Sequence, residues 1–366
     1  PDKAGRDDGV VFGGGARVRH HDLGRQCSGD AARLPGIVEC LRREWRRWRP
    51  DVVHAHSWLS ALAATAATRD AGIPLVVSFH SPDTGARADR PSRVCAQAVQ
   101  AVAGRAGRIL AANAEEALGL ARKGVDGSVI RVLPNGVDTE TFAPLGRSLR
   151  RGRRPRLLTV GSLGPDRGVH DVVSALLRVQ DAELLVAGGP VTGDEAIDPD
   201  ADPGLESVRV HADRVGVLPR VRLLGAVGRD LLPALIRSAD VLVHVPHRDA
   251  FATAALEAMS CERPVVASTV GTLNDVVVDH VTGLLVPPAD PDRLGRTLRT
   301  LLGEPTRRTA FGIAGRDRAM SCFSWSRLVP AVEARYDEAR DRLDTATPVD
   351  DRPRGAAAPH ARRGSG

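Results

Sequence analysis

The chain has 366 residues, 42% of them hydrophobic, and a formal net charge of +6 from 51 Lys and Arg residues against 45 Asp and Glu residues. This length is too great for one ordinary core and predicts two domains of about 150 residues each. Five scattered cysteines without a CxxC pair argue against a disulfide framework and against a zinc site. Because the chain also lacks an apolar run of about 18 residues and the residue order of a signal peptide, we expect a cytoplasmic protein.

The N-terminal segment differs from the usual start of a ligand-binding doubly wound domain, which is a buried strand, a Gly turn and a helix. Gly13-Gly-Gly15 is a candidate Gly loop, but the segment after it carries charges and two His residues where a helix needs an apolar stripe. We interpret it as a loop that leads into a short strand. We therefore expect the true first βα unit to be missing from this chain, which begins with Pro rather than Met.

Two Arg-rich segments invite a comparison with nucleic-acid-binding proteins. In the first, Leu41, Trp45 and Trp48 have the spacing of one buried helix face opposite a charged face. In the second, the run from Arg147 to Arg156 contains no aromatic residue on which a base would stack. We therefore predict no nucleic-acid partner and a solvated linker at 146–155, with contact to anionic membrane headgroups as a minor alternative.

From residue 50 onward, short apolar runs alternate with helical patterns. In the first half we expect strands at 51–56, 74–79, 108–112 and 129–133, with helices at 60–70, 93–103 and 115–122. In the second half we expect strands at 156–161, 183–188, 221–225, 241–246 and 264–268, with helices at 169–179, 205–214 and 231–238. Continuous Val, Ile and Leu runs between helices predict parallel sheets that are covered on both faces.

This alternation divides the chain into two tandem doubly wound domains. We expect an N-terminal domain at 1–145, the Arg-rich linker at 146–155 and a C-terminal domain at 156–322. A closing helix at 323–343 is expected to cross back, and the segment 344–366, rich in Pro, Ala, Arg and Gly, is expected to be disordered.

The most informative segment runs from Asp249 to Pro287. Asp249 and Glu257 lie eight residues apart around the start of a short helix, at the carboxyl end of one predicted strand and just before the next. Open α/β sheets bind nucleotides at such positions. The fixed order of acid, aromatic residue, small residues, acid, buried strand and Gly turn is more specific than a single Gly-rich loop, and it predicts a nucleotide ligand.

Further motifs accompany this segment: His54-Ala-His56, Ser78-Phe-His80, Pro134-Asn-Gly-Val-Asp138, the segment 160–168, Ala187-Gly-Gly189 and the segment 279–287. Together they resemble the retaining glycosyltransferases of family 4, which have the GT-B fold, over about residues 50–343. The resemblance implies an α/β architecture in which two Rossmann-like parallel-sheet domains face a cleft. It also implies a nucleotide-diphosphate sugar as donor and a small-molecule, lipid-linked or glycan acceptor, with no cofactor and no metal.

By this resemblance, the donor site lies in the second domain. Glu257 would bind the ribose hydroxyls and Asp249 the hydroxyls of the donor sugar, while Phe251, Ala252 and Thr253 would present backbone N–H groups to the diphosphate and the sugar. Two structural alternatives remain open, namely Glu257 as an acid in the first turn of a helix and Thr253 as the N-cap of that helix.

The resemblance also implies residues that contact the leaving diphosphate. Arg167 stands where the family has a Lys, whose positive charge stabilises the nucleoside diphosphate as the anomeric C–O bond breaks. Ser162, beside Gly161, stands where the family has an Arg, and loss of that donor would cost roughly 3 to 4 kcal/mol of transition-state stabilisation. The catalytic residues expected on this basis are Arg167, Asp249 and His80.

Three positions of the donor domain carry a side chain where the family has Gly, namely Ala252, Glu262 and Thr272, the last of which is placed beside the phosphates. Since Gly serves such positions through a positive φ or a close backbone approach, we expect a changed loop path or about 1 to 2 kcal/mol of strain. These departures, with Asp249 in place of a Glu, motivate an alternative function as a degenerate, non-catalytic sugar-nucleotide binder. A sugar-nucleotide 2-epimerase is a less favoured alternative.

On the side of the first domain, the resemblance places His80 near the donor sugar and the acceptor, with a structural hydrogen bond as the alternative. We expect His54 and His56 to face opposite sides of their strand, so that one at most lines the cleft, and we choose His56. Asn135 completes the residues expected on the acceptor side.

The acidic segment Asp198-Pro-Asp-Ala-Asp202 resembles a metal-binding triplet. It lacks the closing acid of a calcium loop, because the position expected to hold Glu is Arg209. We therefore predict a solvated loop there and no metal site.

Overall fold

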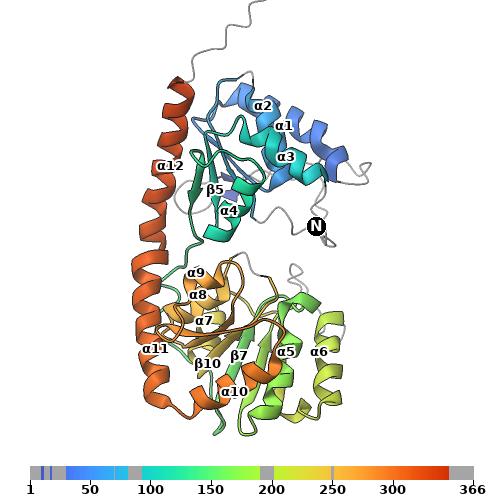
Figure 1. Ribbon diagram of the computed structural model, residues 1–366, viewed down its shortest axis with the longest axis vertical. Helices are drawn as coiled ribbons and strands as arrows, with labels where there is room; N and C mark the ends of the chain where they lie inside the picture. The colour runs from blue at the N-terminus through green and yellow to red at the C-terminus, as the bar shows by residue number, and fades with distance from the viewer. Residues whose placement is uncertain are drawn as a thin grey trace, which may run out of the picture.

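The computed structural model describes residues 10–11, 17–18, 30–69, 71–80, 93–189, 202–248 and 251–345. It shows two α/β domains, one above the other, with the last helix running along one side of both (Figure 1). The two parallel sheets confirm the predicted pair of doubly wound domains. The candidate Gly loop at Gly13-Gly-Gly15 and the predicted tail beyond residue 345 lie outside the described residues.

The first domain is built on a four-stranded parallel sheet in the order β3-β4-β5-β6. Its strands are short apolar runs, as expected for a sheet buried between helices. The bounds are β3 (Val53–His56), β4 (Leu75–Ser78), β5 (Arg108–Ala111) and β6 (Ile130–Val132), with α1 (Leu34–Arg47) after η1 (Asp30–Arg33), α2 (Trp58–Thr68), α3 (Arg93–Ala103) and α4 (Ala114–Arg122). A separate antiparallel pair joins β1 (Val10–Val11) to β2 (Arg17–Val18).

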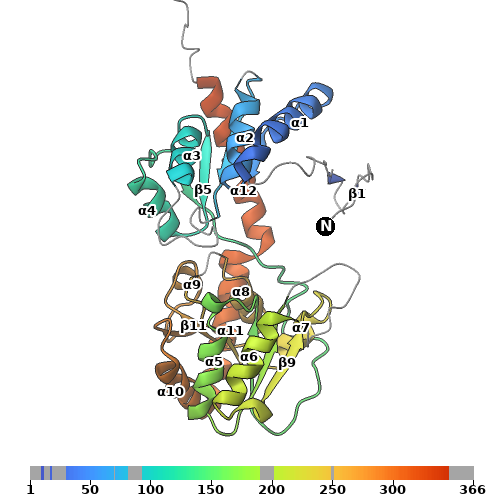
Figure 2. The same ribbon diagram turned by 90° about the vertical axis from the view of Figure 1, so that its right-hand side faces the viewer.

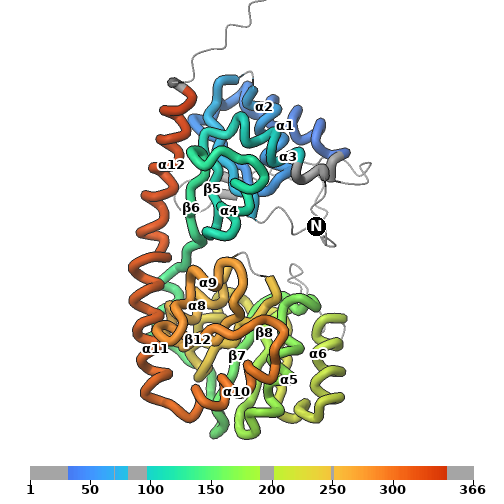
Figure 3. Tube along the Cα trace, in the orientation of Figure 1, coloured from blue at the N-terminus to red at the C-terminus, as the bar shows by residue number. Residues whose placement is uncertain are grey.

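One face of this sheet is covered by a helix from the far end of the chain. The helix α12 (Trp325–Thr345) packs with Ala339 against Val76 and Leu110, so the closing helix crosses back as predicted. A Cβ on Gly107 would lie 2.9 Å from that of Ala339, which shows how closely helix and sheet approach. Figure 3 follows the tube of α12 from the second domain to the first.

The prediction of a buried face at Leu41, Trp45 and Trp48 is wrong. No residue of α1 is buried, and Trp48 is 70% exposed. The helix ends at Arg47 and Trp48 has an extended backbone, with φ −148° and ψ 107°. Pro50 disfavours the helical conformation at Arg49, so the helix must end by that residue, and it ends at Arg47, before Trp48.

The second domain contains a six-stranded parallel sheet in the order β12-β11-β10-β7-β8-β9. This doubly wound order reverses between β7 and β10. The strands are β7 (Arg156–Val160), β8 (Glu183–Ala187), β9 (Val221–Gly225), β10 (Val241–His244), β11 (Val265–Ser268) and β12 (Gly283–Val286). The helical elements are η2 (Pro165–Arg167), α5 (Val169–Ala175), η3 (Leu176–Arg178), α6 (Pro203–Arg214), η5 (Leu218–Arg220), α7 (Leu232–Arg237), α8 (Thr253–Ser260), α9 (Leu273–Val276), α10 (Pro291–Leu302), α11 (Pro305–Arg318) and the π-helix η6 (Ala319–Phe323).

Successive residues of these strands pack alternately in two hydrophobic cores, one on each face of the sheet. Leu157 packs in the core that also contains residues of α5, α6 and α10, whereas Leu158 packs in the core with residues of α7, α8 and α9. This alternation follows from the period of two along a strand. Arg156, which ends the Arg-rich run, is 2% exposed and binds Glu183 and Ser238, so the run does not stay solvated to its last residue.

Two segments connect the domains, and they meet. Val137 N–H in the first segment donates to Phe323 O in the second, and Val137 forms a β-bridge with Ser324. The two domains are seen from the side in Figure 2, with α4 of the first domain above α9 of the second. Among the described residues, no helix has the length and the apolar composition that a membrane crossing requires.

Candidate functional site

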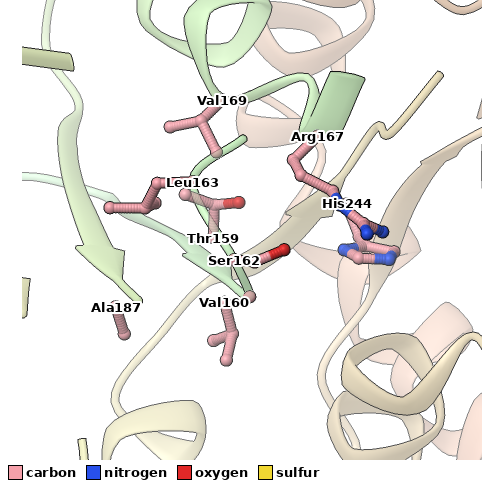
Figure 4. A pocket seen from close by; sticks show the side chains of 9 residues that line it. Thr159, Val160, Ser162, Leu163, Arg167, Val169, Ala187 and His244 are labelled. Carbon is pink, nitrogen blue, oxygen red and sulfur yellow. The ribbon is translucent and has the colours of Figure 1, made fainter. Parts of the chain in front are cut away.

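The strand reversal between β7 and β10 produces a hollow at the carboxyl ends of these strands, where doubly wound sheets bind ligands. In Figure 4 the Ser162 hydroxyl points toward the side of the hollow where Arg167 and His244 lie. Three expected site residues, Gly161, Ser162 and Arg167, are therefore brought together here. The residues that line the hollow are Thr159, Val160, Gly161, Ser162, Leu163, Arg167, Val169, Ala187 and His244.

Glycines allow the loop after β7 to pack this closely. Gly168 has φ 72°, and a Cβ there would collide with the carbonyl oxygen of Val245 in the loop after β10. The Arg167 side chain just before it is 46% exposed, and its ion pair with Asp166 is long at 3.7 Å. This loop therefore presents a partly exposed positive charge beside the hollow, where an anion could bind it.

The segment that precedes α8 comes from the other side of the hollow. Asp249 lies outside the described residues, so its expected contact with the sugar has no structural account. Ala252 is buried and has φ 50° and ψ 24°, the left-handed conformation that Gly adopts without strain. Glu262 has φ 56°, whereas Thr272 has φ −63°. The expected strain is therefore present at Ala252 and Glu262, and absent at Thr272.

The structure decides both alternatives for α8. Thr253 is the first helical residue and Ala252 the N-cap, without a side-chain cap, so Thr253 is not the N-cap. Glu257 is the fifth residue of the helix, beyond the first turn where an acid gains most from the helix dipole. Its position therefore needs another explanation.

Glu257 is a buried carboxylate with a single charged neighbour in the described structure. It is 2% exposed, and burial raises its pKa, while the Arg229 guanidinium opposes this effect. Arg229 Nη1 donates to Glu257 Oε1 at 2.5 Å. A buried carboxylate that keeps a counter-ion is suited to accept hydrogen bonds from a ligand hydroxyl.

Sequence reasoning did not identify Arg229. It lies in the loop between β9 and α7, separated from Glu257 by 28 positions along the chain. Its guanidinium also lies over the Phe142 ring, 5.0 Å from the centroid. A single arginine in a loop has no spacing that would indicate its partner, so only the folded chain reveals this pair.

Histidines gather on the first domain at the ends of β3 and β4. His56 Nδ1 and His80 Nε2 are 2.8 Å apart, and the His80 ring lies 5.4 Å from the ring of Phe251, which belongs to the loop before α8. His80 and Phe251 therefore face each other across the two domains. Asn135 Nδ2 donates to the Phe251 carbonyl at 3.5 Å, which brings a third expected residue to the same place.

The prediction that His54 and His56 face opposite sides of their strand is wrong. Their ring centroids are 4.2 Å apart, because residues i and i+2 of a strand point to the same face. His54 binds the Tyr336 hydroxyl of α12 and the Ser78 hydroxyl, both at 2.9 Å. His54 is therefore occupied with holding α12, whereas His56 reaches His80.

Burial lowers the pKa of each of these three imidazoles. For His54, burial and then the neighbouring His56 and His80 lower the pKa from 6.5 to about 4. Burial also lowers the pKa of His56 and of His80, with Glu116 opposing it at His80. The three side chains are therefore neutral at pH 7 and suited to hydrogen bonds with hydroxyl groups rather than to charge stabilisation.

Thr272, expected beside the phosphates, is buried and contacts the first domain. Its hydroxyl accepts a 2.8 Å hydrogen bond from Asn113, the N-cap residue of α4, and Asp275 accepts one from Ala114 N at 3.2 Å. The amino end of α4 is thus bound to α9 of the second domain. This contact gives the Thr272 hydroxyl a role between the domains.

The predicted solvated loop at 198–202 falls largely outside the described residues. Asp202, its last residue, is the N-cap of α6 and accepts a hydrogen bond from Leu205 N at 2.8 Å. Within the described part of the chain, no three His, Cys, Asp or Glu side chains gather as a metal site requires.

Each half of the amino-acid sequence matches the model of a known protein family. Residues 146–318 match the family described as Glycosyl transferases group 1, and residues 4–141 match Glycosyltransferase Family 4. A glycogen synthase of Mycobacterium tuberculosis is 31% identical over 306 residues, covering 81% of this chain and 70% of the relative. A D-inositol 3-phosphate glycosyltransferase of Kineococcus radiotolerans is 33% identical over 369 residues, covering 89% of this chain and 81% of the relative.

Solved structures share the arrangement of the two domains. A sucrose-phosphate synthase from Thermosynechococcus elongatus has a TM-score of 0.81 at 23% identity, covering 92% of this chain and 86% of that one. The Anabaena protein Alr3699/HepE, solved in complex with UDP and glucose, has a TM-score of 0.69 at 18% identity, covering 85% of this chain and 83% of that one. These matches and the two sheets show that the chain belongs to the group 1, family 4 glycosyltransferases and has the GT-B fold.

Proposed function

We propose that this glycosyltransferase moves a sugar, with retention of anomeric configuration, from a nucleotide-diphosphate sugar to a hydroxyl group of an acceptor. The observation that carries the proposal is the pair of charges around one strand reversal. An exposed cation, Arg167, follows β7, and a buried carboxylate, Glu257, follows β10. A nucleoside diphosphate carries the complementary groups, which are phosphate oxygens for Arg167 and ribose hydroxyls for Glu257.

The reaction requires a positive charge beside the leaving diphosphate, and Arg167 could supply it. When the anomeric C–O bond breaks, its electron pair passes to the phosphate oxygen, and Arg167 would stabilise the charge that develops there. Retention requires the acceptor oxygen to arrive on the face that the diphosphate leaves. The hydroxyl proton can then pass to the departing phosphate oxygen, which balances the reaction without a further base.

The first domain would hold the acceptor. His80 and His56 are neutral and lie together, and His80 faces Phe251 of the donor domain, so the two side chains can donate and accept hydrogen bonds with hydroxyl groups. The names of the relatives reported above refer to glycogen and to D-inositol 3-phosphate. We therefore choose glycogen and D-inositol 3-phosphate as the first acceptors, and UDP-glucose as the first donor because HepE has been solved with it.

We also propose that no metal ion takes part, since Arg167 supplies positive charge at the diphosphate. Transfer should therefore continue at an unchanged rate after treatment with EDTA. A rate that falls with EDTA and returns with added Mg²⁺ would contradict this part of the proposal.

The test of the donor site is calorimetric titration of the protein with UDP, GDP and ADP. Glu257→Ala should weaken binding of the preferred nucleotide by about 10- to 100-fold, since a buried acceptor of two hydroxyl groups is lost. Glu206→Ala, at a partly exposed residue of α6 that is ion-paired with Arg209, is the matched control and should bind like the unchanged protein. The proposal fails if no nucleotide binds, or if Glu257→Ala binds equally well.

The test of the reaction is NMR analysis of the product. The anomeric configuration of the donor sugar should be kept in the product formed with an acceptor. Conversion of the sugar nucleotide to an epimer without an acceptor would favour the 2-epimerase, and donor binding without any turnover would favour a non-catalytic binder.

A further inference from the structure

Arg229 approaches Glu257 from the solvent side of the donor site. The arginine side chain is 69% exposed, whereas the glutamate side chain is 3% exposed. The Phe142 ring, itself 1% exposed, lies under the guanidinium at 5.0 Å. This ring supports the guanidinium by a cation–π contact, while most of the arginine side chain stays exposed to solvent.

The Arg229–Glu257 contact occupies only some of the hydrogen-bond acceptor positions of the carboxylate. The hydrogen bond joins one guanidinium nitrogen, Nη1, to one oxygen, Oε1, instead of the two parallel bonds of a bidentate pair. A carboxylate has about four acceptor positions, so Arg229 leaves room for two hydroxyl groups. The arginine therefore does not have to leave when a ribose binds.

The surroundings of Glu257 offer little other compensation for a buried negative charge. Among the described residues, Arg229 is the cation that interacts with it. The neighbouring Cys261 thiol is buried and neutral, and Asp138 adds negative charge near Arg229. Three further cations, Arg237, Arg263 and Arg316, face Cys261. Loss of Arg229 would leave the carboxylate without its counter-ion, and a carboxylate in that situation takes up a proton.

We propose that Arg229 is a positioning residue for ribose recognition, which holds Glu257 ionised and oriented and stays in place when the nucleotide binds. This inference rests on the proposed function in one respect, namely that Glu257 binds the ribose hydroxyls. It assigns the recognition of ribose to an Arg–Glu pair instead of to a lone carboxylate. A protonated Glu257 would offer one acceptor fewer and a donor that competes with the hydroxyls.

The experiment compares UDP with 2′,3′-dideoxy-UDP as calorimetric probes, or the matching pair for GDP or ADP if that base binds better. In the unchanged protein, loss of both hydroxyls should weaken binding by about 10-fold or more. In Arg229→Met the two probes should bind within about 2-fold of each other near neutral pH, because the carboxylate no longer recognises the hydroxyls. Arg229→Lys, which restores a positive charge, should recover most of the difference.

The dependence on pH provides a readout that a purely structural role would not change. In Arg229→Met the pKa of Glu257 rises further, so affinity for UDP should increase as the pH is raised from about 5.5 to about 8.5 and the carboxylate loses its proton. The unchanged protein should show little change in the upper half of this range. Arg299→Met, at an exposed residue of α10, is the control for loss of one surface arginine.

Three outcomes overturn the proposal. Tighter binding of UDP to Arg229→Met would show that the arginine competes with the ribose. Equal loss of affinity for both probes, which leaves their ratio unchanged, would show a general electrostatic effect, and unchanged affinity for both probes would show no role at all. If Glu257→Ala binds UDP weakly while Arg229→Met behaves like Arg299→Met, this inference fails and the donor site stands. If the unchanged protein binds none of the nucleotides, both proposals fail.

Discussion

The two domains share one architecture but differ in how their sheets are covered. In the second domain, residues on both faces of a six-stranded sheet pack against helices that come from the same part of the chain. Among the described residues of the first domain, one face of the sheet packs on α2 and α3, whereas the other packs on α12, which arrives from the far end of the chain. The helix α1, which packs against α2, contributes no buried residue to this domain.

This difference indicates that the first domain depends on a helix from the end of the chain for part of its core. The difference between the domains also applies to the two sides of the candidate site. The donor residues stand on the domain with complete cores, and the histidines that face them stand on the domain that α12 completes. Stability of the first domain and geometry of the acceptor side should therefore change together.

The largest effect is expected inside the donor domain, at Gly168→Ala. The added Cβ would collide with the Val245 carbonyl and would hold a left-handed φ of 72°, so the loop that carries Arg167 must move. Misplacement of a catalytic charge by about 1 Å lowers the rate about 100-fold. Steady-state transfer assays should show this loss. Gly164→Ala, where φ is −63° and the nearest atom is 3.4 Å away, is the control, and an equal loss there would contradict the explanation.

The next effect addresses the dependence of the first domain on α12. Ala339→Asp buries an unpaired carboxylate at a site 1% exposed and should lower the free energy of unfolding of the first domain by about 3 kcal/mol or more. Ala334→Asp, on an exposed face of the same helix, should change it little. Three of the four tryptophans, Trp45, Trp48 and Trp58, lie in the first domain and none lies in residues 156–322, so tryptophan fluorescence in a urea titration reports mainly on the first domain. Equal destabilisation by both variants would remove the asymmetry between the domains.

A smaller effect tests how His54 joins α12 to the sheet. Its pKa of about 4 in the folded protein lies below the value of 6.5, so the unfolded state binds more protons between these pH values. Stability should therefore fall as pH decreases from about 6.5 to about 4, by about 2 kcal/mol from this group after allowance for solvent screening. Urea titrations at several pH values should show a shallower fall for His54→Asn than for the control His280→Asn. Identical slopes would exclude His54 as the source.

The smallest effect concerns the bond between the domains. Thr272→Val removes the hydroxyl that accepts from Asn113 and should lower the free energy of unfolding by about 1 kcal/mol. In a double-mutant cycle with Asn113→Ala, the two changes should be less than additive, because they share one hydrogen bond. Thr300→Val on the exposed side of α10 serves as the control. Strict additivity would mean that the contact contributes nothing between the domains.

Much of the fold could be predicted from local patterns. The strand expected at 108–112 is β5 (Arg108–Ala111), and the helix expected at 93–103 is α3 (Arg93–Ala103). Runs of Val, Ile and Leu between helices indicate buried parallel strands wherever they occur, because the pattern reflects burial on both faces. Short or irregular elements, such as the four residues of α9 and the π-helix η6, have no such periodicity and were not predicted.

The site was predictable to a lesser degree. Motif order led to Gly161, Ser162 and Arg167, and the structure places these three around one hollow. Arg229 was missed, because an arginine has the same local signal whether it meets solvent or a buried carboxylate. The predicted side of His54 is wrong, because residues i and i+2 of a strand point to the same face of the sheet.

The order of apolar runs, glycines and acids along the chain was sufficient to identify two parallel-sheet domains and the family, since these features depend on neighbours in sequence. Tertiary structure alone decided that Arg229 meets Glu257, that Asn113 binds Thr272 and that Ala339 of α12 packs against Val76 and Leu110. Each of these contacts joins residues that are far apart along the chain. Their energies depend on which surfaces the folded domains bring together, and no local pattern encodes that choice.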